Sequence, residues 1–295
     1  MDDIETRELR YFLAVANNLH FGRAAAALGM AQPPLSRAIQ QLERRLGVRL
    51  LDRDRRGVTL TSAGSVLLHE AQVALDAVTA AARRTRRADS EASLTLATKA
   101  GASHLLLSRL LDTYAREHPD APPIDVTICE VGEQAGLLRT GFADAAIMHR
   151  PVDDLDGFET EDILTEKQVA IVPAVHPLAQ RSELTLAEAN GVPDLPAARW
   201  PRRDGSYPDG PGPQVHTQSQ LAQLVALGRA LLIIPESSRA WQWPQHAAVP
   251  VVDAPTVTTV LAWPALSRPR RIAPLLDTVR ELAGTAAPDA TVPRR

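Results

Sequence analysis

The most constraining feature of the sequence is a pair of short helical patterns separated by a glycine, Gly29. Residues 21–28 are rich in alanine, which favours a helix and lets a second helix approach closely. Residues 32–46 place leucine or isoleucine at intervals of four, three and four, so one face of this second helix is apolar. Pro33 and Pro34 fall in its first turn, where missing N–H groups cost little. The pattern predicts a helix-turn-helix.

The other face of the second helix carries polar side chains that suit contact with duplex DNA. Glutamine pairs with adenine and arginine with guanine through two hydrogen bonds each, and serine reaches a base or a phosphate. Taken alone, such a helix is more often a solvated surface helix, and only the ordered set of elements favours DNA. Arg23, in the preceding helix, is expected to face a phosphate or to stay on the surface. The expected DNA contacts on the second helix are Gln32, Pro33, Pro34, Ser36, Arg37 and Gln40.

Residues 48–61 predict a small β-wing beside these helices. Two short apolar runs flank a polar turn, and Arg53, Arg55 and Arg56 are expected at its tip on the phosphate backbone. Residues 1–90 have a net charge of +4 and residues 91–295 a net charge of −7. We therefore expect only the N-terminal part to meet a polyanion, with a salt-dependent affinity.

A long helix is predicted from residue 62 to about residue 88. At about 1.5 Å per residue it spans roughly 39 Å. Small and apolar residues, among them Val66, Ala74 and Val78, keep one side apolar. A long helix with such a seam usually packs against a copy of itself, so we expect a dimer.

Residues 91–295 alternate apolar strands with helices, which predicts an α/β domain with helices on both faces of a sheet. Ligands of such sheets bind at the carboxyl ends of the strands, where helix N-termini also attract anions. Capping, core or surface roles remain open for each candidate at these ends, and Cys129 is more often a small buried hydrophobe than a sensor. The expected ligand neighbours are Thr98, Lys99, Ser103, Cys129, His149 and Gln218. The expected strands are 94–98, 124–129, 143–148, 168–173, 230–234 and 257–263, and the expected helices are 103–117, 133–140 and 220–227.

Several classes of protein are disfavoured by what the sequence lacks. A single cysteine excludes an intrachain disulfide and a multi-cysteine zinc site. The absence of a signal-like N-terminus and of an 18-residue apolar run predicts a cytoplasmic protein with no membrane partner. Nucleotide-binding and serine-hydrolase motifs are missing, so we expect no enzyme, no cofactor and no metal. An enzyme or a solute-binding receptor built on the α/β part remains the alternative.

Four spaced motifs in residues 5–66 resemble the winged helix-turn-helix of LysR-type transcriptional regulators. They are Ala-Ala-x-x-Leu, Gln-Pro-x-x-Ser-Arg-x-Ile-x-x-Leu-Glu, Leu-Gly-x-x-Leu-Leu-x-Arg and Leu-Thr-x-Ala-Gly. The runs at 138–148, 169–179 and 224–237 are similar to parts of the effector-binding region of the same family. Residues 199–213, rich in proline and glycine, and Arg229 depart from the family pattern.

The resemblance implies an α/β protein with an N-terminal winged helix-turn-helix, a linker helix and a two-lobed effector domain like that of periplasmic binding proteins. It implies a homodimer or homotetramer that binds double-stranded DNA at a promoter operator and responds to a small molecule. The polar and basic candidates favour a carboxylate as that effector. The expected domains are 1–61, 62–90 for the linker or dimerisation helix, and 91–295, with lobe 1 at about 92–163 and 268–285 and lobe 2 at about 164–267.

Overall fold

The computed structural model divides the chain into two compact units, which we describe separately. The first unit is Met1–Asp89 with Arg139–Gly141, and the second is Ser90–Leu138 with Phe142–Arg295. The residues that the structure describes are 4–54, 57–88, 93–201, 206–241, 243–265 and 269–285.

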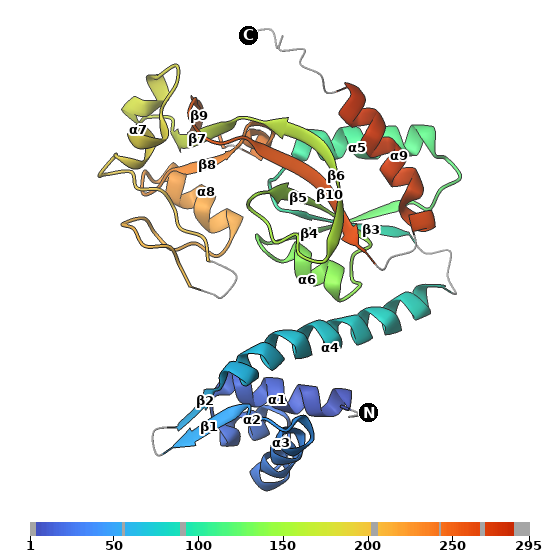
Figure 1. Ribbon diagram of the computed structural model, residues 1–295. Coiled ribbons are helices and arrows are strands. Elements are labelled where there is room, and N and C mark those ends of the chain that lie inside the picture. The colour runs from blue at the N-terminus through green and yellow to red at the C-terminus, as the bar shows by residue number, and fades with distance from the viewer. Residues whose placement is uncertain are drawn as a thin grey trace. The chain divides into compact units, whose positions relative to one another are not determined.

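The first unit is a helix-turn-helix with a β-hairpin and a long helix (Figure 1). The hairpin strands pair antiparallel, with Leu51 opposite Leu60. The predicted helices, wing and long helix are confirmed to within a few residues. In chain order the elements are α1 (Thr6–Asn18), α2 (Phe21–Ala27), α3 (Gln32–Leu46), β1 (Leu51–Asp54), β2 (Gly57–Leu60) and α4 (Ser62–Ala88).

The apolar face of α3 supplies the centre of this unit's core. Leu35, Ile39 and Leu42 are fully buried, and they pack with Phe12 of α1 and Phe21 of α2. Burying one such side chain contributes about 1.5–3 kcal/mol. The intervals of four and three in the sequence therefore fix which face of α3 is left for other contacts.

The start of α4 is fixed by a capping hydrogen bond and by a close backbone contact with the residue before the wing. Thr61 caps α4, because its hydroxyl oxygen accepts a hydrogen bond from the N–H of Gly64 at 3.0 Å. A side chain at Gly64 would begin only 2.0 Å from the carbonyl oxygen of Leu50. Glycine is therefore required where the start of α4 meets Leu50, the residue before β1.

The second unit consists of two α/β lobes (Figure 1). Lobe 1 has a five-stranded sheet in the order β4-β3-β5-β10-β6, in which β3 is parallel to both β4 and β5. β10 runs antiparallel to both β5 and β6. The elements of lobe 1 are β3 (Leu94–Lys99), α5 (His104–Glu117), β4 (Ile124–Cys129), α6 (Gln134–Arg139), β5 (Ala145–Arg150), β6 (Phe158–Glu166), β10 (Val257–Pro264) and α9 (Pro269–Thr285).

Helices cover both faces of the lobe 1 sheet, as the sequence predicts. On one face, residues of α5 and α9 such as Leu110 and Leu275 pack against Leu96. On the other face, Leu138 of α6 packs against Met148. The carboxyl ends of β3, β4 and β5 therefore meet at one edge of a sheet covered on both sides.

Lobe 2 has a smaller antiparallel sheet in the order β8-β7-β9. The apolar pattern did not predict β6, β9, α7 or the helix α9, although the family resemblance implies a crossing strand near 160–168, where β6 lies. β6 is rich in acidic residues with only Ile163 buried, and β9 contains Pro250, so neither has the pattern of a buried strand. The elements of lobe 2 are β7 (Gln168–Pro173), η1 (Pro177–Gln180), α7 (Leu186–Asn190), α8 (Gln218–Ala226), β8 (Leu232–Pro235), η2 (Glu236–Trp241) and β9 (His246–Val251).

Candidate nucleic-acid interface and ligand site

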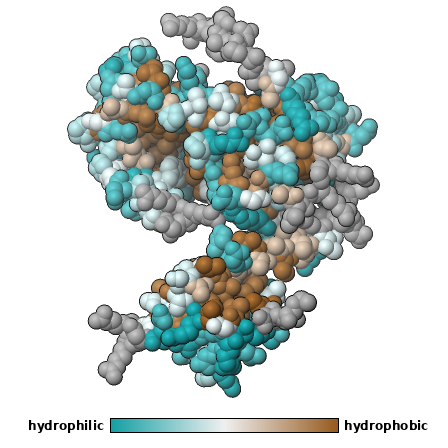
Figure 2. Space-filling view, in the orientation of Figure 1, coloured by the Kyte–Doolittle hydropathy of each residue, from teal (hydrophilic) through white to brown (hydrophobic). Residues whose placement is uncertain are grey.

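The polar face of α3 is open to a partner. Gln32, Pro33, Arg37 and Gln40 are exposed, while Pro34 and Ser36 are half-buried. These are the six residues that the sequence predicts for DNA contact, and they lie opposite the buried leucines of the same helix. The polar tip of α3 is also visible as a hydrophilic region in Figure 2.

The wing and α2 arginines differ in placement. Arg53 does not extend from the wing: its guanidinium lies 4.5 Å from the centre of the Phe21 ring and 3.4 Å from the Ser36 hydroxyl oxygen. The guanidinium of Arg23 donates to the carbonyl oxygen of Asn18 at 2.8 Å, at the end of α1. Arg55 and Arg56, predicted at the wing tip, lie outside the described residues.

Two acidic residues that the prediction did not single out brace the first unit. Glu43 on α3 accepts hydrogen bonds from the N–H groups of Leu50 and Leu51 at 2.9 and 3.2 Å. The side chain of Glu8 on α1 pairs with Arg45 on α3. Periodicity alone does not reveal such contacts, because the partners are distant in sequence or on different elements.

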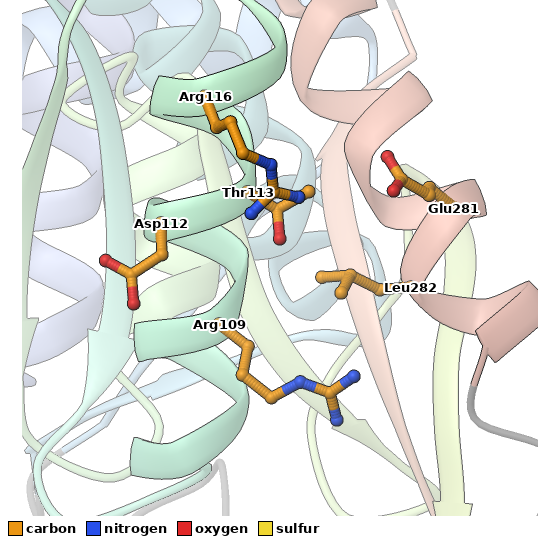
Figure 3. Close-up of a pocket in the computed structure, with 6 residues that line it drawn as sticks. All are labelled: Arg109, Asp112, Thr113, Arg116, Glu281 and Leu282. Carbon is orange, nitrogen blue, oxygen red and sulfur yellow. The ribbon is translucent and has the colours of Figure 1, made fainter.

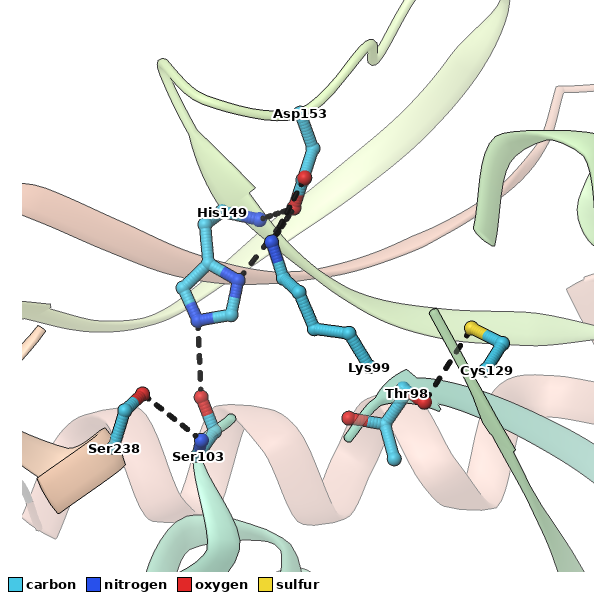
Figure 4. A network of polar contacts seen from close by, with 7 residues as sticks. All are labelled: Thr98, Lys99, Ser103, Cys129, His149, Asp153 and Ser238. Carbon is cyan, nitrogen blue, oxygen red and sulfur yellow. Dashed lines mark hydrogen bonds and ion pairs between the residues drawn. The ribbon is translucent and has the colours of Figure 1, made fainter. Parts of the chain in front are cut away.

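In the second unit, the predicted ligand neighbours other than Gln218 gather at the carboxyl edge of the lobe 1 sheet (Figure 4). Lys99 ends β3, and its ammonium lies 2.8 Å from both carboxylate oxygens of Asp153. Asp153 also accepts a hydrogen bond from the backbone N–H of His149 on β5 at 2.7 Å. Asp153 was not predicted from the sequence, although a buried lysine requires a carboxylate nearby.

Ser103 connects this network to lobe 2. It precedes α5 in a left-handed conformation, with φ 50°, and it is only 1% exposed. Its hydroxyl lies 3.1 Å from Nε2 of His149, and its N–H donates to the hydroxyl of Ser238 on η2 at 3.3 Å (Figure 4). Ser238 is thus a second residue that the sequence analysis missed.

The remaining three candidates lie around the same edge. The Cys129 thiol, at the end of β4, donates to the carbonyl oxygen of Thr98 at 3.4 Å. The N–H of Gln218, at the start of α8 in lobe 2, donates to the carboxylate of Glu130 at 3.2 Å. Two elements of lobe 2, η2 and α8, therefore form hydrogen bonds with the segments that follow β3 and β4 in lobe 1.

Burial controls protonation at this site. It lowers the pKa of His149 below its ordinary value, which keeps the imidazole neutral near pH 7. Burial would raise the pKa of Asp153, but the hydrogen bond with His149 and the charge of Lys99 outweigh it and hold that pKa below its ordinary value. Burial, reinforced by Glu133, raises the pKa of the Cys129 thiol to about 11, so this cysteine is not a thiolate near pH 7.

Several buried polar atoms around this edge are available to a further partner. The hydroxyls of Thr98 and Thr259 and both amide atoms of Gln134 have no hydrogen-bond partner within the described residues. Thr259 lies opposite His149 in the β5–β10 pairing. Buried polar groups in folded proteins are nearly always satisfied, so these atoms are candidates for binding a polar ligand.

A separate hollow lies on the outer side of lobe 1, between α5 and α9 (Figure 3). It contains none of the predicted site residues, and its charges are of both signs. Its lining residues are Arg109, Asp112, Thr113, Arg116, Glu281 and Leu282. Among the described residues, no cluster of histidine, cysteine or acidic side chains is arranged to hold a metal ion.

The fold and the two sites define a DNA-binding regulator with a two-lobed α/β domain for a small molecule. The family description "Bacterial regulatory helix-turn-helix protein, lysR family" matches residues 6–65, and "LysR substrate binding domain" matches residues 87–284. The chain belongs to the LysR family of transcriptional regulators.

Relatives of known sequence span nearly the whole chain. The chain is 33% identical to the uncharacterized HTH-type transcriptional regulator YnfL of Escherichia coli over 280 residues, covering 89% of this chain and 93% of YnfL. It is 32% identical to the Hca operon transcriptional activator HcaR of Escherichia coli, covering 88% and 92%.

Solved structures share the architecture. A full-length point mutant of BenM aligns with a TM-score of 0.53 at 26% identity, covering 98% of this chain and all of that one. CbnR in complex with its target DNA aligns with a TM-score of 0.51 at 26% identity, covering 95% of this chain and all of that one. In the described part of this chain, no helix is long and apolar enough to cross a membrane.

Proposed function

We propose that the polar face of α3 enters the major groove of an operator and that Gln32, Ser36, Arg37 and Gln40 contact the bases. The observation that carries this proposal is the exposure of this face while Leu35 and the other apolar residues of α3 are buried. Pro33 and Pro34 begin the helix beside the bases, and Arg23, Arg55 and Arg56 supply phosphate contacts.

The test uses the full-length protein and a duplex selected by it from a random pool. Arg37→Ala should weaken binding to this duplex by about 1–3 kcal/mol and relax the preference at one base position. Arg7→Ala is the matched control, because Arg7 is also exposed but lies on α1, paired with Glu5. Equal affinities of wild type and Arg37→Ala would contradict the groove assignment.

We further propose that residues 62–90 act as the dimerisation helix between a DNA-binding domain, 1–61, and an effector domain, 91–295. Exposed apolar side chains on α4 support this, since Val66 is 63% exposed and Val73 and Val78 are each 44% exposed. Val73→Asp should shift the protein toward monomer in sedimentation experiments, whereas Glu70→Asp should not. Pairing of effector domains would extend the dimer to a tetramer.

The effector is proposed to bind at the carboxyl edge of the lobe 1 sheet, facing lobe 2. Thr98, Ser103, His149 and Gln218 are the proposed contacts, with Cys129 as an apolar neighbour. Lys99 contributes less charge than the sequence suggests, because Asp153 binds its ammonium. The N-terminus of α5, which has no side-chain cap, instead supports a small carboxylate as the ligand.

Titration of a panel of small carboxylates and the matching amides tests this assignment. We expect the carboxylate to bind more tightly than its amide and Thr98→Val to weaken it. If Thr98→Val and a surface control, Thr165→Val, bind every compound equally, Thr98 does not contact the ligand.

Sensing, rather than catalysis, is the proposed role of this site. Ser103, His149 and Asp153 contact one another in the order found in a serine hydrolase. The Ser103 hydroxyl lies next to Nε2 of His149, and Asp153 lies 3.5 Å from its Nδ1 atom. However, Lys99 binds both oxygens of Asp153, and Ser103 is almost completely buried. If a probe that reacts with nucleophilic serines fails to label Ser103, the result agrees with this role. Labelling of Ser103 would contradict it. As a regulator of transcription, the protein is proposed to act in the cytoplasm.

A further inference from the structure

The guanidinium of Arg53 is the meeting point of three elements of the first unit. Arg53 lies on β1, yet its side chain is only 30% exposed because it folds back over the Phe21 ring of α2. A planar guanidinium 4.5 Å from an aromatic centre is held by both charge and stacking. The orientation of the group is therefore set by the protein and not by a partner.

The two ends of the same guanidinium reach α3. Nη1 lies 3.4 Å from the hydroxyl oxygen of Ser36, and Nη2 lies 3.7 Å from Oε2 of Glu43. The other carboxylate oxygen of Glu43 accepts from the backbone N–H groups of Leu50 and Leu51. Glu43 and Arg53 thus join α3 to the wing at two points, one through the backbone and one through a side chain.

This arrangement has a chemical consequence for Ser36. Arginine only donates hydrogen bonds, so the Ser36 oxygen is the acceptor in this contact. The hydroxyl hydrogen must then point away from Arg53, and Ser36 presents a donor. A donor on this face of α3 suits an acceptor atom of a base, such as N7 of a purine, O6 of guanine or O4 of thymine.

We infer that Arg53 is a positioning residue that fixes Ser36 as a hydrogen-bond donor for base recognition, rather than a phosphate contact of the wing. This inference rests on the proposed insertion of α3 into the major groove. Its effect is on sequence discrimination, whereas a phosphate contact would add affinity for any duplex.

Arg49 provides a matched comparison. It lies beside the same wing, but its side chain is 68% exposed and pairs with Asp52 at 3.4 Å. It also contacts the carbonyl oxygen of Leu51, so both of these contacts are within the wing segment. Replacement of either arginine by lysine keeps the charge and removes the planar group.

The experiment compares full-length wild type, Ser36→Ala, Arg53→Lys, the double variant and Arg49→Lys. The probes are the duplex that wild type selects from a random pool and a scrambled duplex of equal composition, each over a range of salt concentrations. We expect Arg53→Lys to lose about tenfold in affinity for the selected duplex. Binding to the scrambled duplex and the salt dependence should stay unchanged, because the charge is kept.

Coupling between the two residues is the decisive readout. The double variant should bind no more than about twofold worse than Ser36→Ala alone, because loss of the hydroxyl leaves Arg53 nothing to orient. Arg49→Lys should stay within about twofold of wild type on both duplexes. Arg53→Lys with wild-type affinity for both duplexes would overturn the inference, as would losses that multiply in the double variant.

Two further results would overturn it for different reasons. An equal loss on both duplexes with a lowered melting temperature would show that Arg53→Lys disrupts the fold rather than the readout. A wild-type protein that enriches no sequence from the pool would defeat the proposed base recognition by α3, and this inference with it.

Discussion

The ion pair between Lys99 and Asp153 allows a quantitative test of how the lobe 1 edge is held together. The side chains are only 8% and 5% exposed, and the ammonium lies 2.8 Å from each carboxylate oxygen. At an effective dielectric constant of about 20, charges this close attract by roughly 6 kcal/mol, which offsets their desolvation. Removing one partner loses this attraction and leaves the other charge buried.

We expect Lys99→Met to lower the free energy of unfolding of lobe 1 by about 3–5 kcal/mol. Asp153→Asn should cost a similar amount, because an uncharged amide cannot balance the ammonium. The double variant should recover most of the loss, to within about 1–2 kcal/mol of wild type, since no charge is left unpaired. In the wild-type structure the N–H of His149 donates to Asp153 at 2.7 Å. The asparagine oxygen of the double variant can accept this same hydrogen bond.

Hydrogen exchange of the β3 and β5 amides in the full chain measures these energies locally, because a chain of two units need not unfold in one step. Arg181→Met is the control, since its ion pair with Glu188 is about half-exposed. If Lys99→Met exchanges as slowly as wild type, or if the double variant is less stable than either single variant, the reasoning about this buried pair fails.

Three further predictions concern other parts of the chain. Gly64→Ala should cost about 3 kcal/mol or more in thermal unfolding of the first unit, because its Cβ would lie 2.0 Å from the Leu50 carbonyl oxygen; Gly136→Ala, with nothing within 4 Å, should be neutral or stabilising. Because the pKa of His149 is lowered on folding, the unfolded chain takes up a proton near pH 6.5 before the folded chain does, so stability falls as the pH drops below that value. His149→Gln should flatten this fall in urea titrations between about pH 7.5 and 5.5, and an unchanged slope would contradict it. Ser238→Ala should speed hydrogen exchange at the start of α5, where the N–H of Ser103 loses its acceptor, while Ser237→Ala, whose hydroxyl instead contacts Glu166, should not.

Local periodicity predicted most of the fold. The intervals in α3 and the continuous apolar runs of β5 and β7 come from side chains that are buried whatever the partner element is. β6 could not be found in this way, because only Ile163 of its nine residues is buried, four of the others are acidic, and its strand form depends on pairing with β10. Its partner lies about a hundred residues further along the chain.

The candidate ligand site was only partly predictable for a related reason. Thr98, Lys99, Cys129 and His149 were found because each lies at or next to the end of a strand. Asp153 follows β5 in a turn that no apolar pattern marks, and only its distance to Lys99, 54 residues away in sequence, gives it a role. Ser238 was missed because nothing local shows that η2 approaches α5.

The strand order of lobe 1 has a consequence for synthesis of the chain. Among the described strands, β6 pairs with β10 alone, and the core of the lobe also needs Leu275 and Val279 of α9. The sheet of lobe 2, which ends with β9 at Val251, is complete before β10 and α9 have been translated. On the ribosome, lobe 2 should therefore fold before lobe 1. The edge of β5 and the apolar side of α5 stay uncovered until about the last 40 residues have been translated.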